Sequence, residues 1–146
     1  MTPSLTRPRV AVTLGDPRGI GPEIVVAALA DERVRAACDI LVVGPSGTVA
    51  PVGDVTGRWS AESGEKLAGA LAAQAIERAV ALAQQGEVAG IVTAPIDKHA
   101  LHEAGYADPG HTEMLARLTG APVAMMLASD RLRVVLATTH IALRDV

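Results

Sequence analysis

The sequence predicts an α/β protein with a mixed β-sheet, and three observations support this. Short runs of β-branched residues alternate with longer amphipathic runs, which is the pattern of strands alternating with helices. Apolar residues make up 49% of the 146 residues but aromatic residues only 1%, so the core is built from small and branched side chains that suit packing of helices on a sheet. The last two predicted strands are joined by a short turn and would pair antiparallel, which makes the sheet mixed.

The first part of the chain is predicted to form two strands around one helix. Val10–Leu14 is a buried strand that ends in a glycine-rich turn. A helix begins near Pro22, because proline suits the first helical position, and it runs to about 27–29. Asp39–Val43 is the second strand, and the stretch 44–58, which is rich in Gly, Pro and Thr and lacks periodicity, is predicted to be a loop.

The longest predicted element is a helix over Ala61–Gln85. Ser60 can cap its amino terminus, and Gly86 can end it in the left-handed conformation. Its predicted buried face has helical spacing and consists of Leu67, Leu71, Ala75, Ala79, Leu82 and Ala83. The remaining predicted elements are a strand, two short helices and a final pair of strands: Ala89–Thr93, Ala100–Ala104, Thr112–Leu118, Val123–Ala128 and Leu132–Thr138.

Composition excludes several classes of protein. Thirteen Lys and Arg against sixteen Asp and Glu give a net charge of −3 without any basic run, so a nucleic-acid partner is not expected. No stretch reaches the ~20 apolar residues that span a bilayer, and no signal peptide is present, so we expect a cytoplasmic protein without a membrane partner. The single cysteine, Cys38, leaves no disulfide within the chain and is expected to be a buried hydrophobic residue.

The first motif that can carry chemistry is the turn Gly15–Glu23, between a strand and a helix. Its glycines allow the backbone to turn sharply and to approach a ligand, and the helix that follows offers unpaired N–H groups. The spacing of these glycines matches neither the dinucleotide fingerprint nor a phosphate-binding Walker loop. A ligand-binding turn and a plain strand-to-helix turn therefore both remain open.

Two further motifs offer groups that can bind an anion. Lys98 follows the carboxyl end of a predicted strand, where ligands of open α/β sheets collect, although most such lysines are simply solvated. His111 and Thr112 stand at the entrance of a helix, where side chains and backbone amides can hold an anion together. The alternative is that Thr112 caps the helix and His111 is a surface residue.

The fourth motif is His140, at the end of the last predicted strand. An imidazole in this position can bind a metal or accept a proton, but a catalytic metal generally requires three protein ligands. His99 and His102 lie three residues apart on a short predicted helix and are more simply explained as exposed side chains.

Taken together and in order, these motifs resemble the 4-hydroxythreonine-4-phosphate dehydrogenase family. The matching segments are VTLGDPRGIGPEI (12–24), IVTAPIDKHALHEAG (91–105), GHTEMLARLTG (110–120) and VAMMLASDRLRVVLATTHIALRDV (123–146). Two departures stand out: Arg18 replaces the usual Ala, and Asp97 replaces a frequent Asn. The loop over 44–58 is also short for the family.

The resemblance implies a fold similar to the isocitrate and isopropylmalate dehydrogenases, an α/β/α sandwich of which 1–146 is the amino-terminal portion. It implies a homodimer that uses NAD and a divalent metal (Zn, Mg or Co) to oxidise and decarboxylate 4-phosphohydroxy-L-threonine in pyridoxal phosphate synthesis. Related phosphorylated four-carbon sugar acids are an alternative substrate class, and an inactive fragment is another alternative; the isolated chain is expected to be incomplete and inactive. The implied substrate residues are His111, Thr112 and Lys98, and the implied cofactor residues are Gly15, Asp16, Gly19, Ile20 and Gly21. The implied metal ligand is His140. The other two histidines of the family's metal site fall in motifs that this sequence lacks.

Overall fold

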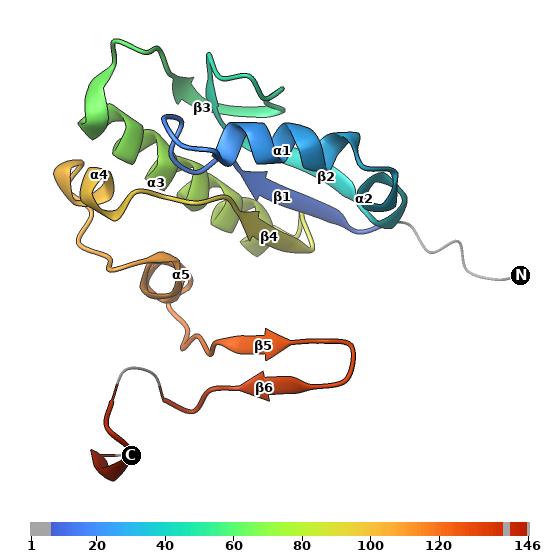
Figure 1. The fold of residues 1–146 in the computed structure, drawn as a ribbon, viewed down its shortest axis with the longest axis vertical. Helices are drawn as coiled ribbons and strands as arrows, with labels where there is room; N and C mark the ends of the chain where they lie inside the picture. Colours follow the sequence, from blue (N-terminus) through green and yellow to red (C-terminus); the bar gives the residue numbers. More distant parts are fainter. Residues whose placement is uncertain (1–6, 139–140, 146) are drawn as a thin grey trace, which may run out of the picture. The chain divides into compact units, whose positions relative to one another are not determined.

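Four parallel strands with the order β3-β2-β1-β4 form a central sheet (Figure 1). The computed structural model describes residues 7–138 and 141–145. The strands are β1 (Arg9–Thr13), β2 (Asp39–Ser46), β3 (Asp54–Arg58) and β4 (Gly90–Thr93). β1 lies inside the sheet, where Val10 is opposite Ile40 of β2 on one side and Gly90 of β4 on the other.

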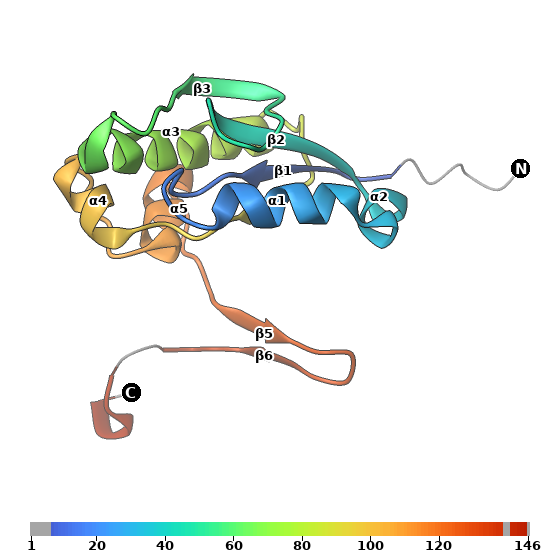
Figure 2. The same ribbon diagram turned by 45° about the horizontal axis from the view of Figure 1, so that its top comes forward.

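Helices cover both faces of this sheet, which confirms the predicted α/β fold and its three layers (Figures 1 and 2). On one face lies α1 (Gly21–Ala30), which is followed by the short helix α2 (Glu32–Ala37). On the other face lies α3 (Gly64–Gln84), against which α4 (Lys98–Glu103) packs. Each face has its own core: Leu14, Val25, Val42, Ala50 and Ala94 on the α1 side, and Ala11, Val43, Ala75, Ala79, Leu82 and Val88 on the α3 side.

Small residues allow α3 to approach its neighbours closely. The buried residues of this helix are mostly alanines, and the predicted buried face is correct except at Leu67, which is 40% exposed, and Ala83, which is only partly buried. A Cβ atom at Gly69 would collide with the backbone carbonyl of Ala100. The backbone of α4 therefore packs directly against α3 at Gly69. The helix ends at Gly86, whose φ of +74° confirms the predicted left-handed stop.

Three local predictions are wrong. The stretch 44–58 is not all loop, because β2 continues to Ser46 and β3 pairs with it in parallel. The helix α2 was not predicted; its six residues begin at Glu32, and it is capped by Asp31, whose side chain accepts a hydrogen bond from the Arg33 N–H. Helix α3 begins at Gly64 rather than Ala61, and Ser60 does not cap it, because its hydroxyl instead meets the hydroxyl of Ser63 at 3.1 Å.

The chain divides into two units, Met1–Pro109 and Gly110–Val146. The second unit contains α5 (His111–Thr119), the strands β5 (Met126–Ala128) and β6 (Arg133–Val135), and a 3-10 turn over Leu143–Asp145. The predicted antiparallel hairpin is present, since β5 and β6 pair antiparallel. In the described residues, however, the hairpin is a separate two-stranded sheet and the four-stranded sheet is parallel throughout, so the expectation of one mixed sheet is corrected.

Two further expectations concern burial and membranes. Cys38 is only half-buried rather than buried, and its thiol lies 3.7 Å from the Val34 carbonyl at the end of α2. Among the helices of residues 7–138 and 141–145, none combines the length and the apolar character needed to cross a bilayer.

Candidate functional site

The strand order creates a switch point at the carboxyl ends of β1 and β4. After β1 the chain continues to β2 and β3 on one side, and it later returns to add β4 on the other side. The connections leave β1 and β4 in opposite directions, and a crevice opens between them. Such a crevice is where open α/β sheets bind their ligands.

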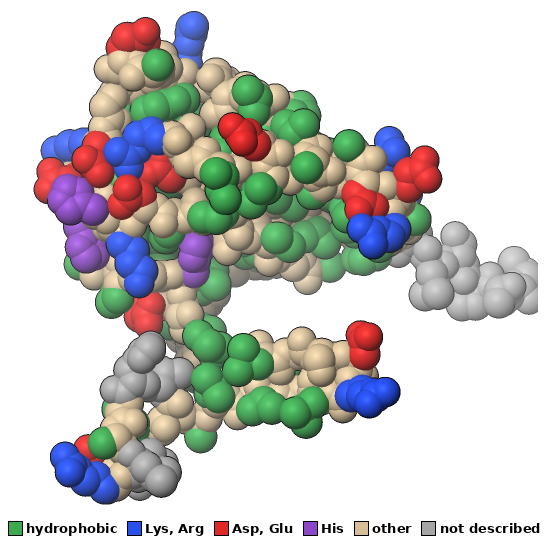
Figure 3. Space-filling view, viewed as in Figure 1, with side chains coloured by type: hydrophobic (Ala, Val, Ile, Leu, Met, Phe, Trp, Pro, Cys, Tyr) green, Lys and Arg blue, Asp and Glu red, His purple; other side chains and the backbone are tan. Residues whose placement is uncertain are grey.

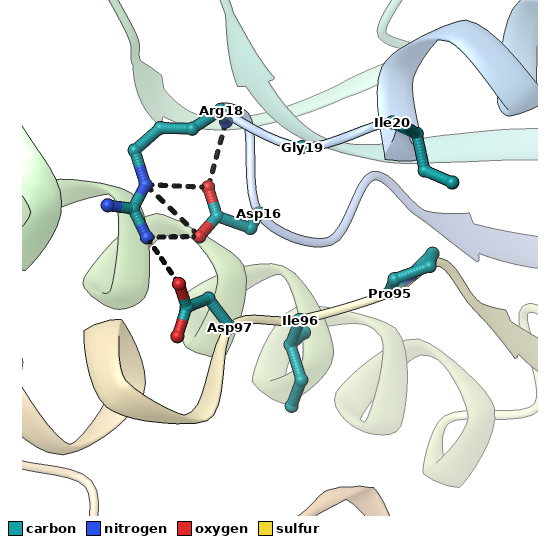
Figure 4. Close-up of a pocket in the computed structure, with 7 residues that line it drawn as sticks. All are labelled: Asp16, Arg18, Gly19, Ile20, Pro95, Ile96 and Asp97. Atoms are coloured by element: carbon teal, nitrogen blue, oxygen red, sulfur yellow. Dashed lines mark hydrogen bonds and ion pairs between the residues drawn. The ribbon is translucent and has the colours of Figure 1, made fainter.

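A pocket of about 470 Å³ lies at this switch point (Figure 4). Its walls come from the turn after β1 and from the segment after β4. The lining residues are Asp16, Arg18, Gly19, Ile20, Pro95, Ile96 and Asp97. Three of the five residues predicted to bind the cofactor therefore line one pocket: Asp16, Gly19 and Ile20.

The other two predicted cofactor residues, Gly15 and Gly21, shape the turn from within. Gly15 has a φ of +67°, and a Cβ atom there would collide with the Pro95 carbonyl. A Cβ atom at Gly21 would collide with the carbonyl of Leu14. These glycines hold the turn against its neighbours, and neither is among the residues that line the pocket, so a direct contact with the cofactor stays a prediction.

The side chain of Asp16 organises the turn. Asp16 is 4% exposed, and its Oδ1 accepts the Arg18 backbone N–H at 2.8 Å. The guanidinium of Arg18 donates to both carboxylate oxygens, with Nη2 lying 2.8 Å from Oδ2 and Nε 3.1 Å from Oδ1. The backbone N–H of Asp16 donates to the Pro95 carbonyl at 2.9 Å and so ties the turn to the segment after β4.

Arg18 also connects the turn to two helices. Its Nη2 donates to Asp97 Oδ2 at 2.9 Å, and its Nη1 lies 3.3 Å from Oε1 of Glu65, at the start of α3. Hydrogen bonding to Asp16 raises the pKa of Arg18 well above its ordinary value, and the arginine stays charged. The two departures from the family pattern, Arg18 and Asp97, are thus in direct contact although 79 positions separate them.

Asp97 has a second role as the cap of α4. Its Oδ1 accepts the backbone N–H groups of His99 at 2.8 Å and Ala100 at 3.2 Å. The bond from Ala100 is the main reason that the pKa of Asp97 is lowered, and Arg18 contributes to the same effect. Lys98, predicted to meet the substrate, is exposed in the first turn of α4 and does not line the pocket.

Charged side chains gather over the starts of α3 and α4 (Figure 3). His99 belongs to this group, because its Nδ1 lies 3.2 Å from the Glu65 carboxylate. His99 and His102 are both exposed, as predicted. In the part of the chain that the structure describes, no group of three His, Cys, Asp or Glu side chains is arranged to hold a metal ion. His140, the predicted metal ligand, lies outside the described residues.

The start of α5 in the second unit contains the other predicted substrate residues. The helix begins at His111 with Gly110 as its cap, and no side chain caps it. Thr112 therefore lies inside the helix, and the alternative that it serves as the cap is wrong. The Nε2 atom of His111 is buried and has no hydrogen-bond partner among the described residues, and burial lowers the pKa of this histidine. Lys98 belongs to the first unit, so a substrate site that combines it with His111 and Thr112 stays a prediction.

Four of the residues that line the pocket were not assigned a ligand from the sequence: Arg18, Pro95, Ile96 and Asp97. Arg18 lies within the predicted turn Gly15–Glu23, and the other three precede Lys98 at the carboxyl end of a predicted strand, where ligands were expected to collect. The opposite charges of Arg18 and Asp97 were a possible signal, but nothing in the linear sequence places the turn after β1 beside the segment after β4. That juxtaposition depends on β4 adding next to β1.

Comparison with known proteins places these features in a family. The sequence model of the family described as "Pyridoxal phosphate biosynthetic protein PdxA" matches residues 21–146. A D-threonate 4-phosphate dehydrogenase of Cupriavidus necator is 41% identical, with 94% of this chain and 51% of the relative aligned. A 4-hydroxythreonine-4-phosphate dehydrogenase of Geobacter metallireducens is also 41% identical, with 97% of this chain and 51% of the relative aligned.

A solved structure agrees with the sequence comparisons. The 4-hydroxythreonine-4-phosphate dehydrogenase of Burkholderia phymatum superposes with a TM-score of 0.80 at 36% identity, covering 95% of this chain and 52% of the other. The chain thus spans about half the length of the relatives that it matches.

Proposed function

Because the chain belongs to the PdxA family of pyridoxal phosphate biosynthetic proteins, we propose that it serves in an NAD-dependent dehydrogenase acting on a phosphorylated four-carbon hydroxy acid. The first candidate substrate is 4-phosphohydroxy-L-threonine, because two of the relatives are named 4-hydroxythreonine-4-phosphate dehydrogenase. Oxidation of its secondary hydroxyl gives a β-keto acid, which loses carbon dioxide. The observation that carries the proposal is the family match over 21–146.

D-threonate 4-phosphate is a second candidate substrate. The relative from Cupriavidus necator that is named for this substrate is as similar to the chain as the relative from Geobacter metallireducens, at 41% identity each. Both substrates present a phosphate at one end and a hydroxyl to be oxidised. The proposed substrate residues are assigned to the phosphate, which both substrates carry, so both substrates belong in the same experiment.

In this proposal the switch-point pocket receives part of the dinucleotide. NAD supplies the hydride acceptor, and the protein supplies its position. Asp16 and Arg18 fix the turn, and Gly19 and Ile20 lie at the pocket wall; a Cβ atom at Gly19 would make only ordinary contact with the Asp16 carbonyl oxygen. The tight turn at Gly15 keeps these residues beside the segment after β4.

The start of α5 is proposed to bind the phosphate. Uncapped amides at a helix start attract anions, because the helix dipole places partial positive charge there. The Thr112 hydroxyl can add a donor in the first turn. Burial favours the neutral form of His111, so its imidazole contributes a hydrogen bond rather than a full charge.

A divalent metal stays a prediction of the resemblance, together with His140 as one of its ligands. Within residues 7–138 and 141–145 no cluster of metal-ligating side chains is present, so the described residues do not by themselves fit a metal. We therefore assign no chemical step to a metal. The proposal includes a homodimer in the cytoplasm, and an inactive chain is the alternative to be tested.

The experiment is a turnover assay combined with a binding assay. The purified chain is mixed with NAD⁺, a divalent metal and either 4-phosphohydroxy-L-threonine or D-threonate 4-phosphate, and NADH absorbance is followed. The proposal predicts NADH formation with at least one substrate, and Thr112→Val is expected to raise the KM for the substrate more than the KM for NAD⁺. Glu103→Gln, on the exposed side of α4, is the control.

Two outcomes contradict parts of the proposal. If neither substrate yields NADH although calorimetry detects NAD⁺ binding, the chain is an inactive binder, and the dehydrogenase assignment fails for it. If NAD⁺ does not bind either, the cofactor assignment fails as well.

A further inference from the structure

The contacts of the Arg18 side chain differ in how far they are buried. Towards its own turn, Nε and Nη2 donate to the two oxygens of Asp16 at 3.1 and 2.8 Å, and this carboxylate is only 6% exposed. On the other side, Nη2 donates to Asp97 at 2.9 Å and Nη1 lies 3.3 Å from Glu65, and these two side chains are 44% and 41% exposed. Arg18 therefore has one buried partner within the turn and two exposed partners outside it.

The buried contact fixes the arginine in one orientation. A guanidinium is a rigid planar fork, and two parallel bonds to one carboxylate hold it in its plane. The backbone N–H of Arg18 also donates to Asp16 Oδ1 at 2.8 Å, so the main chain and the side chain of Arg18 are tied to the same group. Moving the guanidinium away would leave the buried Asp16 carboxylate without its partner, which is strongly unfavourable. The contact with Asp16 is therefore the fixed end of the arrangement.

The exposed contacts are weaker and join the turn to other elements. Ion pairs in contact with water contribute little to stability, and salt screens them. Glu65 lies in the first turn of α3, and Asp97 immediately precedes α4, on the pocket wall that faces the turn (Figure 4). Because Asp16 prevents Arg18 from following these partners, loss of the exposed pairs frees the start of α4 to move away from the turn. The wall that can move is the segment after β4.

We propose that Arg18 is an ionic strap across the switch-point crevice, fixed to Asp16 and reversibly attached to Asp97 and Glu65. While it is attached, the strap holds the segment after β4 against the turn and sets the width of the crevice. Rising ionic strength detaches it by screening the two exposed pairs, and the buried pair with Asp16 stays intact. The strap rests on these contacts and on no ligand, so it does not depend on the proposed function.

Hydrogen exchange of the intact chain, followed by NMR without any ligand, measures this opening. The reporter is the backbone N–H of Asp16, which donates to the Pro95 carbonyl at 2.9 Å and exchanges when the two walls separate. Raising the salt concentration from about 0.01 to about 1 M shortens the range of charge interactions about tenfold. The proposal predicts that exchange of this N–H becomes about two- to fivefold faster over that range. The Arg18 Nε–H, which is bound to buried Asp16, should stay protected.

Variants that neutralise the exposed partners test whether these pairs are responsible. Asp97→Asn keeps an oxygen that can cap α4, but its NH₂ group then faces the donors of Arg18. At low salt, Asp97→Asn and Glu65→Gln should each speed exchange of the Asp16 N–H about two- to fivefold, and salt should have no further effect in the double variant. All samples are kept at one pH, because His99 also lies 3.2 Å from Glu65. The control is Glu103→Gln, the same charge change at the opposite end of α4.

Three results would overturn the inference. The first is an equal effect of salt in the wild type and in the double variant, because the double variant has no exposed pair left to screen. The second is unchanged exchange in both Asp97→Asn and Glu65→Gln, or an increase of the same size in Glu103→Gln. The third is loss of protection at the Arg18 Nε–H as salt rises, which would show that the buried end of the strap is released instead.

Discussion

At the scale of single residues, the pair Asp16 and Arg18 repeats an arrangement that recurs at Asp31 and Arg33. In both pairs the aspartate accepts the backbone N–H two residues later at 2.8 Å and the arginine side chain folds back onto the carboxylate. The surroundings differ. Asp16 is buried and its arginine reaches two further carboxylates, whereas the Arg33 side chain is 91% exposed. The Asp16–Arg18 pair should therefore contribute more to the free energy of unfolding than the Asp31–Arg33 pair.

We predict that Arg18→Ala lowers the free energy of unfolding by about 1–2 kcal/mol, because it leaves the buried Asp16 carboxylate without its main partner. Arg33→Ala removes a pair of the same geometry in solvent and should cause no measurable change. Urea unfolding of both variants measures the difference. Equal losses would show that burial of Asp16 does not matter to the pair.

His111 predicts a dependence of stability on pH. Burial lowers the pKa of His111 in the folded chain, so the unfolded chain takes up this proton first as the pH falls. The group has no effect above about pH 7, and the free energy of unfolding declines below about pH 6.5, by at most about 1.4 kcal/mol per pH unit. Unfolding of the wild type and of His111→Asn between pH 7.5 and 5 should give a shallower slope in the variant. Parallel slopes would mean that this histidine takes up its proton equally in both states.

At the scale of elements, the packing of α4 on α3 depends on Gly69. Alanine in place of a mid-helix glycine normally stabilises a helix by about 1 kcal/mol. Here the added Cβ atom would collide with the Ala100 carbonyl and the following N–H group, which are backbone atoms and cannot turn aside. We predict that Gly69→Ala destabilises the protein, a reversal of the usual sign.

Thermal unfolding of Gly69→Ala is compared with that of Lys66→Ala, on an exposed position of the same helix. The control should change the melting temperature little. An increase in melting temperature for Gly69→Ala would contradict the close approach of the two helices.

Elements with long periodic patterns could be predicted from the sequence, whereas short ones could not. Helix α3 was found because its apolar residues repeat over 21 residues, and Gly86 was placed correctly as its left-handed end. Strand β3 was missed because its five residues include a glycine and only one large apolar side chain, Val55, which is 57% exposed. Its position is determined by pairing with β2, a contact that has no local signature.

The same contrast between local and long-range signals applies to the candidate site. The glycines between a strand and a helix left a ligand-binding turn and a plain turn open, and only the resemblance to the family implied that Asp16, Gly19 and Ile20 contact the cofactor. The segment with Pro95 and Ile96 was placed at the carboxyl end of a strand, but its position opposite the turn could not be predicted, since the sequence does not state which strand lies beside β1. The ion pair between Arg18 and Asp97 depends on the same long-range pairing.

At the scale of the whole molecule, the hairpin of β5 and β6 exposes apolar side chains on both of its faces. Leu127 is opposite Val134, and Met126 is opposite Val135; their exposures range from 39% to 58%. An isolated two-stranded sheet is marginally stable in water. Apolar strand edges of this kind also tend to pair with other chains. We infer that this hairpin takes part in association of the protein with itself.

We predict that the chain elutes as a dimer or larger species and that substitution of one hairpin face reduces its mass to that of a monomer. Two double variants test each face in turn: Leu127→Thr with Val134→Thr, and Met126→Thr with Val135→Thr. Threonine retains β-propensity, so the strands should survive. Light scattering coupled to size exclusion measures the mass. A monomeric wild type, or association unchanged in both variants, would exclude the hairpin as the interface.

The central position of β1 has a consequence for the time course of folding. Val10 must pair with Ile40 on one side and with Gly90 on the other, and the pairing with Gly90 closes a much longer loop. The added entropic cost is only about 1 kcal/mol, but pairings distant in sequence form late. During synthesis, β1, β2 and β3 can assemble while β4 is still inside the ribosome. The crevice between β1 and β4 can then form only after β4 has left the ribosome, so ligand binding at the turn reports that β4 has joined the sheet.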